Sequence, residues 1–358
     1  MVFEKLKNNK PAIASVSFLI MVFVVAMAGY LITPDPTPLA NRQFLELGAA
    51  RPGFSVTMLK LSDTGFHEKS GLIRKWIYGQ RTPYRYIPVK NFFREGGNII
   101  AEAYTGDESQ GQELRIDTKG SSFDKFIIVK RFPLGTDQFG RDLLSRLIIG
   151  ARISFAVGLV SVVISLFLGV TIGAAGGYFG GRVDKFVVWL INVLWSVPTL
   201  LLVIAITFAL GKGFWQIFVA VGFTMWVEVA RITRGQILSV REKEYIEAAE
   251  ALGFSRFRII IRHILPNIAG PIIVVAAANF ATAILVEAGL SFLGIGVQPP
   301  MPSWGNMIRE NYHFLLLGEY HLALFPGLVL MLTVLSCMIL GNGIRDAMDV
   351  RSSGTMVS

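Results

Sequence analysis

Apolar residues dominate this chain in stretches of about 20, without the polar positions that recur at every turn in the surface helices of soluble proteins. A helix needs roughly 20 mostly apolar residues to cross a bilayer, because its backbone polar groups must be satisfied internally. The pattern therefore predicts an all-α polytopic membrane protein with six transmembrane helices. The stretches lie near residues 11–32, 153–177, 187–210, 214–230, 268–290 and 322–343.

The first apolar stretch has two interpretations. It follows Lys5, Lys7 and Lys10, and Ala26-Met27-Ala28 resembles the cleavage site of a secretory signal peptide. The apolar run continues to Ile32, however, which is longer than the core of such a peptide. We therefore expect an uncleaved membrane anchor, and cleavage would leave the remaining topology unchanged.

Basic residues collect in alternate connections between the predicted spans. Seven Lys and Arg residues lie between Arg231 and Arg262, whereas the short connections on the other side hold only Lys212 and Arg309. Short cytoplasmic loops of membrane proteins are rich in Lys and Arg. We therefore expect the chain in the bacterial inner (cytoplasmic) membrane, with residues 1–10 and 347–358 both cytoplasmic.

Residues 33–149 contain no spanning stretch after the first helix, and we expect them on the periplasmic side. A connection of this length is either a small domain or a functional insertion. Short apolar and aromatic stretches predict a few strands, for example at Tyr84–Val89 and Phe126–Val129. The segment should therefore be a small folded periplasmic insertion.

An amphipathic helix is expected at the end of this segment, lying on the membrane surface before the second span. Thr136 or Asp137 can cap it. Asp142 and Arg146 are four residues apart and can pair across one turn. The apolar positions of its buried face would be Leu143, Leu144, Leu147 and Ile148.

Small and polar residues inside the predicted spans suggest further features. Pro198 can bend the third helix. Glu287 lies near the end of the fifth span, where a carboxylate is costly and must face protein or water. It is either a pathway or gate residue or an end-of-helix group hydrogen-bonded to the following loop. Glycines that recur every four residues predict a ridge for close helix packing, at Gly169, Gly173, Gly177 and Gly181.

Composition supports a membrane protein and argues against an enzyme. The chain is 53% hydrophobic and 16% charged, whereas soluble domains carry about 25% charged residues. Its net charge of +9 reflects basic loops rather than a nucleic-acid surface. The single cysteine, Cys337, cannot form a disulfide framework. No P-loop, H-E-x-x-H or G-x-S-x-G sequence is present, so we expect no catalytic residue, no bound cofactor and no metal site.

Residues 231–266 form the longest of the basic connections. Good helix formers from Glu242 to Leu252 predict a short helix, which Gly253 ends by adopting a left-handed conformation. A second helix over 255–264 should end at Pro266, before the next span. Such a loop suits a lever docked into a groove of a soluble partner, and a solvated connector that obeys the charge rule fits equally well.

The loop also carries a recognisable motif. Glu247-Ala248-Ala249, followed by Gly253 and then Leu265-Pro266, resembles the EAA loop of binding-protein-dependent ABC importers. His263 stands where the general pattern has Ile, and this variant resembles the dipeptide and oligopeptide branch. Two more stretches and a short C-terminal motif are similar to that branch: 134–146, which includes Asp137, Gly140, Arg141 and Asp142; 290–305, which includes Trp304; and Arg345-Asp346-Ala347.

The resemblance covers about 130–351 and the first helix, and it implies the type I ABC importer permease fold. Helix 11–32 would be followed by the insertion 33–149 and by a transmembrane domain at 150–346. The chain would be the second, or C-type, permease, paired with a B-type permease. Its other partners would be two ATPase subunits that bind ATP and Mg, and a periplasmic or lipid-anchored substrate-binding protein.

The resemblance also implies residue roles and a function. Glu247 would be a polar contact in the ATPase groove, Ala248 and Ala249 would allow close approach, and Gly253 would make the bend. The expected function is import of di- or oligopeptides, driven by the partner ATPases. Import of nickel chelates or another small solute is one alternative. A membrane receptor or scaffold that works through 33–130 is another.

Overall fold

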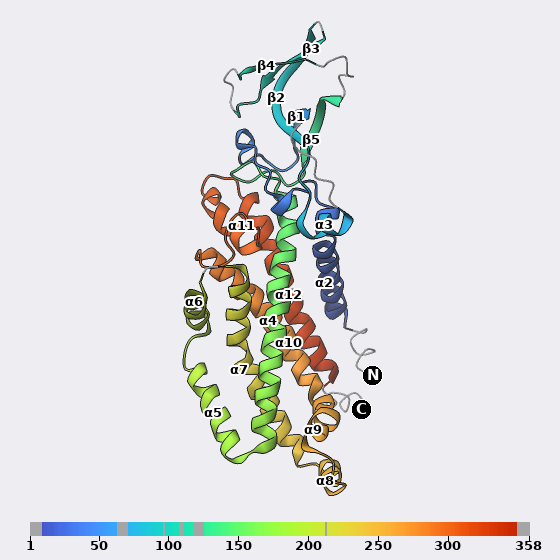
Figure 1. The fold of residues 1–358 in the computed structure, drawn as a ribbon, viewed down its shortest axis with the longest axis vertical. Coiled ribbons are helices and arrows are strands. Elements are labelled where there is room, and N and C mark those ends of the chain that lie inside the picture. The colour runs from blue at the N-terminus through green and yellow to red at the C-terminus, as the bar shows by residue number, and fades with distance from the viewer. Residues whose placement is uncertain are drawn as a thin grey trace, which may run out of the picture. The chain divides into compact units, whose positions relative to one another are not determined.

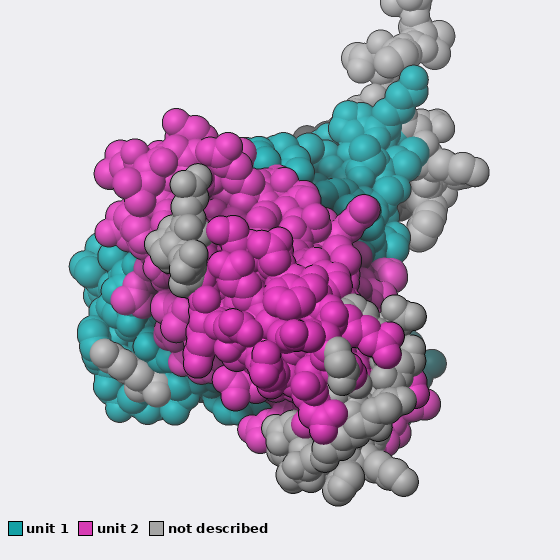
Figure 2. Space-filling view, turned by 90° about the horizontal axis from the view of Figure 1, so that it is seen from above, with its two compact units in different colours: residues 1–23, 153–298, 328–358 teal, residues 24–152, 299–327 magenta. Residues whose placement is uncertain are grey.

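The computed structural model describes residues 9–62, 71–95, 97–106, 111–117, 125–211 and 213–348. The chain divides into two compact units, coloured separately in Figure 2. Unit 1 consists of Met1–Phe23, Ile153–Gln298 and Leu328–Ser358, and unit 2 of Val24–Arg152 and Pro299–Gly327. Lys212 and most of the two expected cytoplasmic ends, 1–8 and 349–358, lie outside the described residues.

Among the described residues, five helices are long and apolar enough to cross a membrane (Figure 1). They are α2 (Lys10–Ala28, continued by η1, Gly29–Leu31), α4 (Leu143–Phe179), α7 (Phe214–Arg241), α10 (Leu265–Phe292) and α12 (His321–Met348). Two further helices, α5 (Gly181–Trp195) and α6 (Thr199–Leu210), meet at a 90° bend and make a sixth span if they cross as one. Pro198 lies at this bend, where it lacks the N–H that a continuous helix requires.

Shorter elements connect these helices. They are α3 (Leu72–Tyr78), α8 (Glu244–Ala251), α9 (Arg256–Arg258), α11 (Trp304–Asn311), the π-helical η5 (Ile259–Ile264), and the 3-10 turns η2 (Pro38–Ala40), η3 (Leu45–Leu47) and η6 (Tyr312–Leu315).

Within unit 1, α4 and α7 pack through the predicted glycine ridge. A Cβ at Gly169 would lie only 2.7 Å from the Trp226 carbonyl oxygen, and Gly173 and Gly177 face α7 carbonyl oxygens in the same way. Only glycine permits this approach of two backbones. The ridge ends one glycine earlier than expected, because Gly181 begins α5 with a φ of +55° and open space around it.

The start of α4 differs from the prediction. The amphipathic surface helix and the second span, expected to begin near 153, are one continuous helix from Leu143. No proline separates the two segments, so nothing stops helix propagation between them. Asp142, rather than Thr136 or Asp137, caps this helix, since its Oδ2 accepts a hydrogen bond from the Ser145 N–H at 2.9 Å.

The connection expected at 231–266 is also shorter at both ends. α7 continues to Arg241, and its Thr233, Ile237 and Val240 side chains are buried. Pro266 does not end a helix, because Arg256–Phe292 is continuous. In a regular α-helix a proline ring clashes with the carbonyl four residues earlier, and the π-helical turn η5 lies where that clash would fall.

Unit 2 contains a five-stranded antiparallel sheet, so the all-α expectation holds for the long helices and not for the insertion (Figure 1). The strands, in the spatial order β4-β3-β2-β1-β5, are β1 (Phe54–Ser62), β2 (Tyr84–Glu95), β3 (Asn98–Ala103), β4 (Glu113–Asp117) and β5 (Ile127–Phe132). Strand β1, which lies between β2 and β5, places Thr57 opposite Val89 of β2 and Val129 of β5. The strands predicted at 84–89 and 126–129 fall in β2 and β5.

The sheet has two hydrophobic clusters. One contains Leu59, Val89, Ile99 and Ala101. The other joins Val56, Met58 and Phe132 of the sheet to Phe44 and Leu47 from the segment that precedes it. This second cluster fixes the sheet to the 3-10 turns that follow α2.

Candidate functional site

The helix α8 at the end of α7 is anchored by two of its residues and exposes the others. Ile246 and Ala249 are buried in a cluster with residues from α4, α7 and α10. Glu247 and Ala248 lie on the exposed side. Of the two alanines expected to allow close approach of a partner, therefore, only Ala248 is on the surface, while Ala249 packs inside the chain.

Gly253 ends α8 as the sequence predicts. Its φ is +77°, its N–H donates to the Glu250 carbonyl at 2.9 Å, and the Phe254 N–H donates to the Ala249 carbonyl at 3.1 Å. These two bonds form the Schellman motif, in which a left-handed residue satisfies the last carbonyls of a helix. No Cβ clash constrains Gly253, so its requirement for glycine comes from φ alone.

Side-chain contacts attach α8 to two long helices. The Tyr178 hydroxyl of α4 donates to Glu250 Oε1 at 3.0 Å. The Asn267 amide of α10 donates to the Tyr245 hydroxyl at 3.1 Å and to the His263 carbonyl at 2.6 Å. A displacement of α8 would therefore pull directly on α4 and α10.

The remaining residues of the motif have varied surroundings. The His263 ring is half-buried and stacks on Phe254, with ring centroids 5.8 Å apart. Leu265 is half-buried beside the α8 cluster, and Pro266 is exposed. Two large apolar side chains of this loop, Leu252 and Phe257, are 74% and 73% exposed. Exposed apolar side chains close in sequence to the exposed Glu247 and Ala248 suit contact with another protein.

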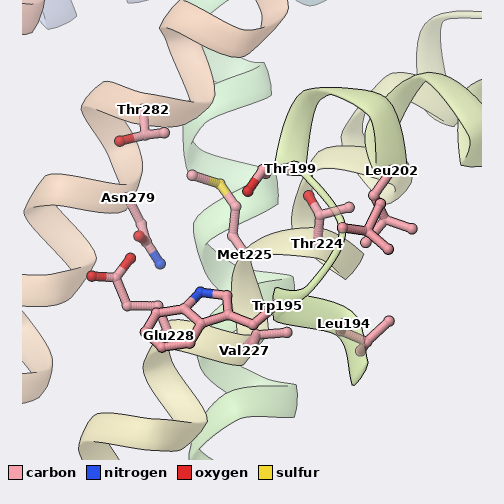
Figure 3. Close-up of a pocket in the computed structure, with 11 residues that line it drawn as sticks. Leu194, Trp195, Thr199, Leu202, Thr224, Met225, Val227, Glu228, Asn279 and Thr282 are labelled. Carbon is pink, nitrogen blue, oxygen red and sulfur yellow. The ribbon is translucent and has the colours of Figure 1, made fainter. Parts of the chain in front are cut away.

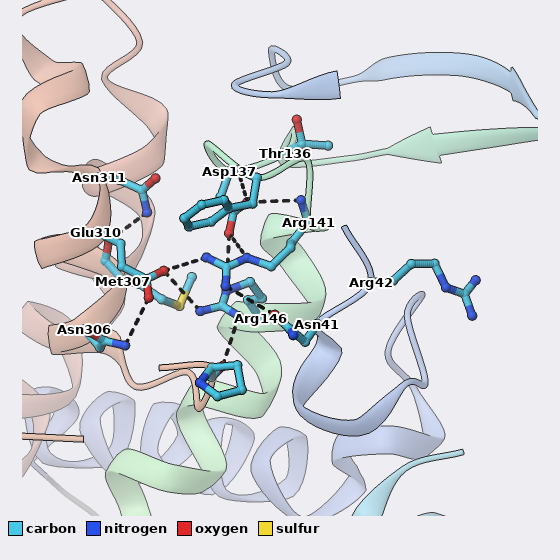
Figure 4. A network of polar contacts seen from close by, with 12 residues as sticks. Asn41, Arg42, Thr136, Asp137, Arg141, Arg146, Asn306, Met307, Glu310 and Asn311 are labelled. Atoms are coloured by element: carbon cyan, nitrogen blue, oxygen red, sulfur yellow. Dashed lines mark hydrogen bonds and ion pairs between the residues drawn. The ribbon is translucent and has the colours of Figure 1, made fainter. Parts of the chain in front are cut away.

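The signature segment before α4 forms a tight turn in unit 2 (Figure 4). Thr136 and Asp142 make an isolated antiparallel bridge, and the Asp137 Oδ1 accepts hydrogen bonds from the N–H groups of Phe139 and Arg141 at 2.9 and 3.0 Å. Gly140 has a φ of +70°, and a Cβ there would overlap the Phe44 carbonyl. Glycine is therefore required at this position by both conformation and space.

Two arginines connect this turn to α11 (Figure 4). Arg141 contacts Asp137 Oδ2 and Glu310 Oε2, each at 2.6 Å. Arg146 contacts the same two oxygens at 3.4 and 3.3 Å. Both arginine side chains are almost fully buried, so the four charges neutralise one another inside unit 2.

Trp304 and Asp142 complete this region. Trp304 is fully buried at the start of α11, and its Nε1 donates to the Leu147 carbonyl at 3.2 Å. Burial raises the pKa of the Asp142 carboxyl above its ordinary value of 3.8, although hydrogen bonds from Ser145 oppose this shift. One oxygen of Asp142, Oδ1, has no hydrogen-bond partner within the described part of the chain.

A small polar cavity of about 90 Å³ opens in unit 1 beside the bend between α5 and α6 (Figure 3). Glu228 of α7 and Asn279 of α10 both line it, near the middle of their helices, together with Thr224 and Thr282. Asn279 Nδ2 is buried without a hydrogen-bond partner among the residues described. Polar side chains in the middle of spanning helices face protein or water in membrane proteins.

Glu287, which the sequence singles out as a pathway or end-of-helix group, is fully buried in α10. Its Oε1 accepts a hydrogen bond from the Ser291 hydroxyl at 2.7 Å, and its Oε2 accepts one from Ser154 at 3.4 Å. The Ser291 oxygen in turn accepts a hydrogen bond from the N–H of Val297, in the loop after α10. These contacts favour the end-of-helix interpretation.

Two residues, Glu310 of unit 2 and Asn279 of unit 1, were not predicted from the sequence. Glu310 binds both buried arginines but is 169 and 164 residues away from them. Asn279 lies in an apolar stretch, where an amide side chain could have been noticed. No local spacing could have linked Glu310 to the turn.

Comparison with known proteins identifies the chain. The family model described as "Binding-protein-dependent transport system inner membrane component" matches residues 161–353. The glutathione transport system permease protein GsiD of Pectobacterium atrosepticum is 40% identical over 216 residues, which cover 60% of this chain and 71% of that protein. The oligopeptide transport system permease protein OppC of Bacillus subtilis is 40% identical over 215 residues, 60% of this chain and 70% of that protein.

A further relative and one solved structure are also similar to parts of this chain. The di/tripeptide transport system permease protein DppC of Pseudomonas aeruginosa is 40% identical over 219 residues, 61% of this chain and 72% of that protein. An inward-facing structure of the MetNI methionine ABC transporter covers 57% of this chain and 97% of its own matched chain, with 18% identity and a TM-score of 0.48.

The long apolar helices and the loop that ends α7 define an integral membrane protein of the permease class. The chain belongs to the family of binding-protein-dependent transport system inner membrane components. Members of this family are non-catalytic permease subunits of ABC importers, and they work with ATPase subunits and another permease.

Proposed function

We propose that this chain is the C-type permease of an ABC importer that moves di- and oligopeptides across the bacterial inner membrane. It would pair with a B-type permease and receive substrate from a periplasmic or lipid-anchored binding protein. Two partner ATPase subunits would bind ATP and Mg and would supply the energy. The names of its relatives, which transport dipeptides, oligopeptides and glutathione, support this substrate class.

The observation that carries the proposal is the construction of α8. It is a short helix with a buried inner face, an exposed outer face and a glycine-dependent end. Such an element transmits force because its inner face is packed against α4, α7 and α10, while its outer face is free to bind. We assign Glu247, Ala248, Leu252 and Phe257 to the contact with the ATPase subunit.

The proposed topology places α8 in the cytoplasm, together with both chain termini. The basic residues of 231–266 support this orientation. The β-sheet of unit 2 would then be a periplasmic insertion after the first helix. Residues 150–346 would form the transmembrane domain, with five spans if α5 and α6 cross as one, and α2 would be the sixth span of the chain.

We assign the polar cavity beside the α5–α6 bend to the side of the chain that lines the transport pathway. Broken helices often border substrate sites in transporters, because their free backbone groups can line a cavity. Glu228 and Asn279 would face the pathway there. Glu287 would instead hold the end of α10 in place through Ser291.

Substitutions at Gly253 test the coupling proposal. A β-branched residue is disfavoured in the left-handed conformation by about 1–2 kcal/mol, whereas Asn tolerates it. We expect Gly253→Val to lower binding-protein-stimulated ATPase activity and peptide uptake by about tenfold or more. Gly253→Asn should keep most of both activities. Membrane insertion, followed by fractionation, should be unchanged in both variants.

Glu247→Lys supplies an independent test, because Glu247 is exposed and its substitution disturbs no internal packing. We expect loss of uptake with normal insertion and normal pairing with the second permease. Wild-type uptake rates in both Glu247→Lys and Gly253→Val would refute the coupling role of this loop.

The substrate is tested on the assembled transporter. Purification of the complex should yield its binding protein, whose affinity for a set of di- and oligopeptides and for nickel chelates can be measured by calorimetry. Peptide binding, with peptide-dependent stimulation of ATPase activity, is the expected result. Tight binding of a nickel chelate and no peptide binding would replace the proposed substrate class.

A further inference from the structure

The short helix α3, inside the insertion, exposes an unusual set of apolar side chains. Leu72 and Ile73 are 80% and 75% exposed, and no residue of α3 is fully buried. Isolated helices of this length are marginal in water, because one turn costs more conformational entropy than its hydrogen bonds return. An apolar environment around these side chains would stabilise the helix.

The apolar side chains of α3 share one face. Leu72 and Trp76 are four residues apart, as are Ile73 and Ile77, so both pairs lie on the same side of the helix. Arg74 and Lys75 point away from that side. An apolar face with tryptophan, opposed by basic residues, is the pattern of helices that lie in the plane of a membrane interface.

The position of α3, at the end of α2, indicates that lipid covers its apolar side chains. The Trp76 Nε1 donates to the Met27 carbonyl at 2.5 Å, at the end of the membrane-spanning helix α2 (Figure 1). From the other side, Arg152 of α4 donates to the Trp76 carbonyl at 2.7 Å and lies over its indole ring, 5.1 Å from the centroid. α3 is thus fixed at the level where α2 ends.

The adjoining surface of α2 is already apolar and exposed. Val24 and Met27 of α2 are 56% and 42% exposed, and Leu31 of the following turn η1 is 58% exposed. In a membrane-spanning helix, such side chains face lipid. α3 lies beside this part of α2, because its Trp76 is hydrogen-bonded to the Met27 carbonyl. Trp76 and Tyr78 belong to the residue types that concentrate at membrane interfaces.

We propose that α3 is an interfacial membrane anchor of the insertion. It lies in the headgroup region of the leaflet where α2 ends, with Leu72, Ile73 and Ile77 at the acyl boundary. The anchor holds the start of β2 beside the membrane, since Gly79 and the Gln80 N–H, which donates to the Pro36 carbonyl at 2.7 Å, follow α3 directly.

Site-directed spin labelling of the assembled transporter in lipid nanodiscs tests this proposal. Cys337 is the single cysteine of this chain, so Cys337→Ala, combined with partner subunits whose cysteines have been replaced, provides a thiol-free background. Nitroxide labels are then attached to Ile73→Cys, to Arg74→Cys on the opposite face, and to Val24→Cys as a lipid reference. Collision rates with oxygen, which enters lipid, and with a water-soluble nickel chelate are measured for each label.

The proposal expects a severalfold higher oxygen-to-nickel collision ratio at Ile73 than at Arg74, approaching the ratio at Val24. Leu72→Cys, on the same face, should repeat the result if the Ile73 label disturbs the helix. Equal nickel access at Ile73 and Arg74 would show that the helix lies in water, which overturns the proposal. Low collision rates with both reagents at Ile73 would show a protein cover, which also overturns it.

Discussion

Arg146 illustrates how a charged side chain is retained in the interior of unit 2. It is 1% exposed and lies between the carboxylates of Asp137 and Glu310. Arg141 contacts the same two carboxylates, so the charges balance. Removing one member of such a network leaves a buried charge without compensation, at a cost of about 3–5 kcal/mol. The network therefore fixes the turn before α4 against α11 in one geometry.

Local spacing predicted the wrong partner for this arginine. Asp142 lies four residues before Arg146, but its carboxylate bonds to the backbone and hydroxyl of Ser145 instead. The i,i+4 pair that does form is Asp137–Arg141, which lies in a turn rather than in a helix. Capping competes with ion pairing at a helix start, and the sequence alone does not decide between them.

The raised pKa of Asp142 leads to a prediction about pH. Because burial raises the folded-state pKa above 3.8, the folded state binds this proton more tightly than the unfolded state. The stabilising effect is complete below the ordinary pKa and is lost as pH rises through the folded-state pKa. Asp142→Asn keeps a capping oxygen but does not titrate, so the melting temperature of the variant minus that of the wild type should increase as pH rises from about 3.8.

This difference can be measured by tryptophan fluorescence during heating in detergent at several pH values. Asp142→Ala is the matched control, because it removes both the titration and the cap and should be less stable than Asp142→Asn at every pH. A melting-temperature difference between Asp142→Asn and wild type that does not change with pH would contradict the assignment.

Among the elements, the contact between α4 and α7 depends on the absence of side chains. A Cβ at Gly173 would overlap the Ala230 carbonyl and lie 2.9 Å from Thr233 Cβ. Gly235 of α7, in contrast, has no atom within 4 Å of such a Cβ. Alanine would therefore clash at Gly173 but not at Gly235, so the two positions form a matched pair.

We expect Gly173→Ala to destabilise the protein by about 1–3 kcal/mol, the usual cost of overpacking a tight contact. Gly235→Ala should be neutral or stabilising by about 0.5–1 kcal/mol, because alanine favours a helix. Thermal unfolding of both variants in the same detergent would measure this. Equal melting temperatures for the two variants would contradict the prediction and would show that α4 and α7 can move apart to accommodate a methyl group at position 173.

The long helices were predictable from the sequence, because a bilayer imposes the same length and polarity on every span. Their ends were less predictable. α7 runs beyond its apolar stretch because Ile237 and Val240 find buried contacts, and these depend on residues far away in the chain. Similarly, the motif predicted where α8 lies, whereas only packing against α4 and α7 shows that Ala249 faces inward.

At the scale of the whole molecule, the two ends of the segment that carries the sheet lie side by side in unit 2. The Gly53 N–H donates to the carbonyls of Phe132 and Pro133 at 3.0 and 3.1 Å, so the chain enters and leaves the sheet at adjacent positions. Residues before and after this point also bond to each other, for example Ala49 to Asp137 at 2.9 Å. The sequence did not decide which partner the sheet contacts, since the recognised family motifs lie outside it.

Replacing residues 54–132 by a short Gly-Ser linker joins these adjacent positions and removes the sheet together with α3, which is bonded to α2 and α4. We expect the long helices to remain folded. If the sheet contacts the binding protein, we expect the purified variant complex to keep its basal ATPase activity and to lose much of the stimulation by loaded binding protein. Unchanged stimulation would make the sheet an accessory element.

Deletion of residues 45–125 is a useful comparison, because its two ends interrupt contacts that the 54–132 replacement preserves or removes completely. It would leave β5 without its partner β1 and would remove Leu47, whose carbonyl accepts the Thr136 hydroxyl. This variant should fail to assemble. Normal assembly of the 45–125 deletion would show that the contacts of the signature turn with this segment are dispensable.

The π-helical turn η5, before Pro266, has a consequence for the angle at which α8 meets a partner. A turn with i→i+5 bonds holds one residue more than an α-helical turn. One residue corresponds to about 100° of rotation around a helix of 3.6 residues per turn. η5 therefore sets the rotational phase between α10 and everything that precedes Ile259. If η5 became α-helical, the loop that carries α8 would rotate about the helix axis by about 100° while α10 stayed in place.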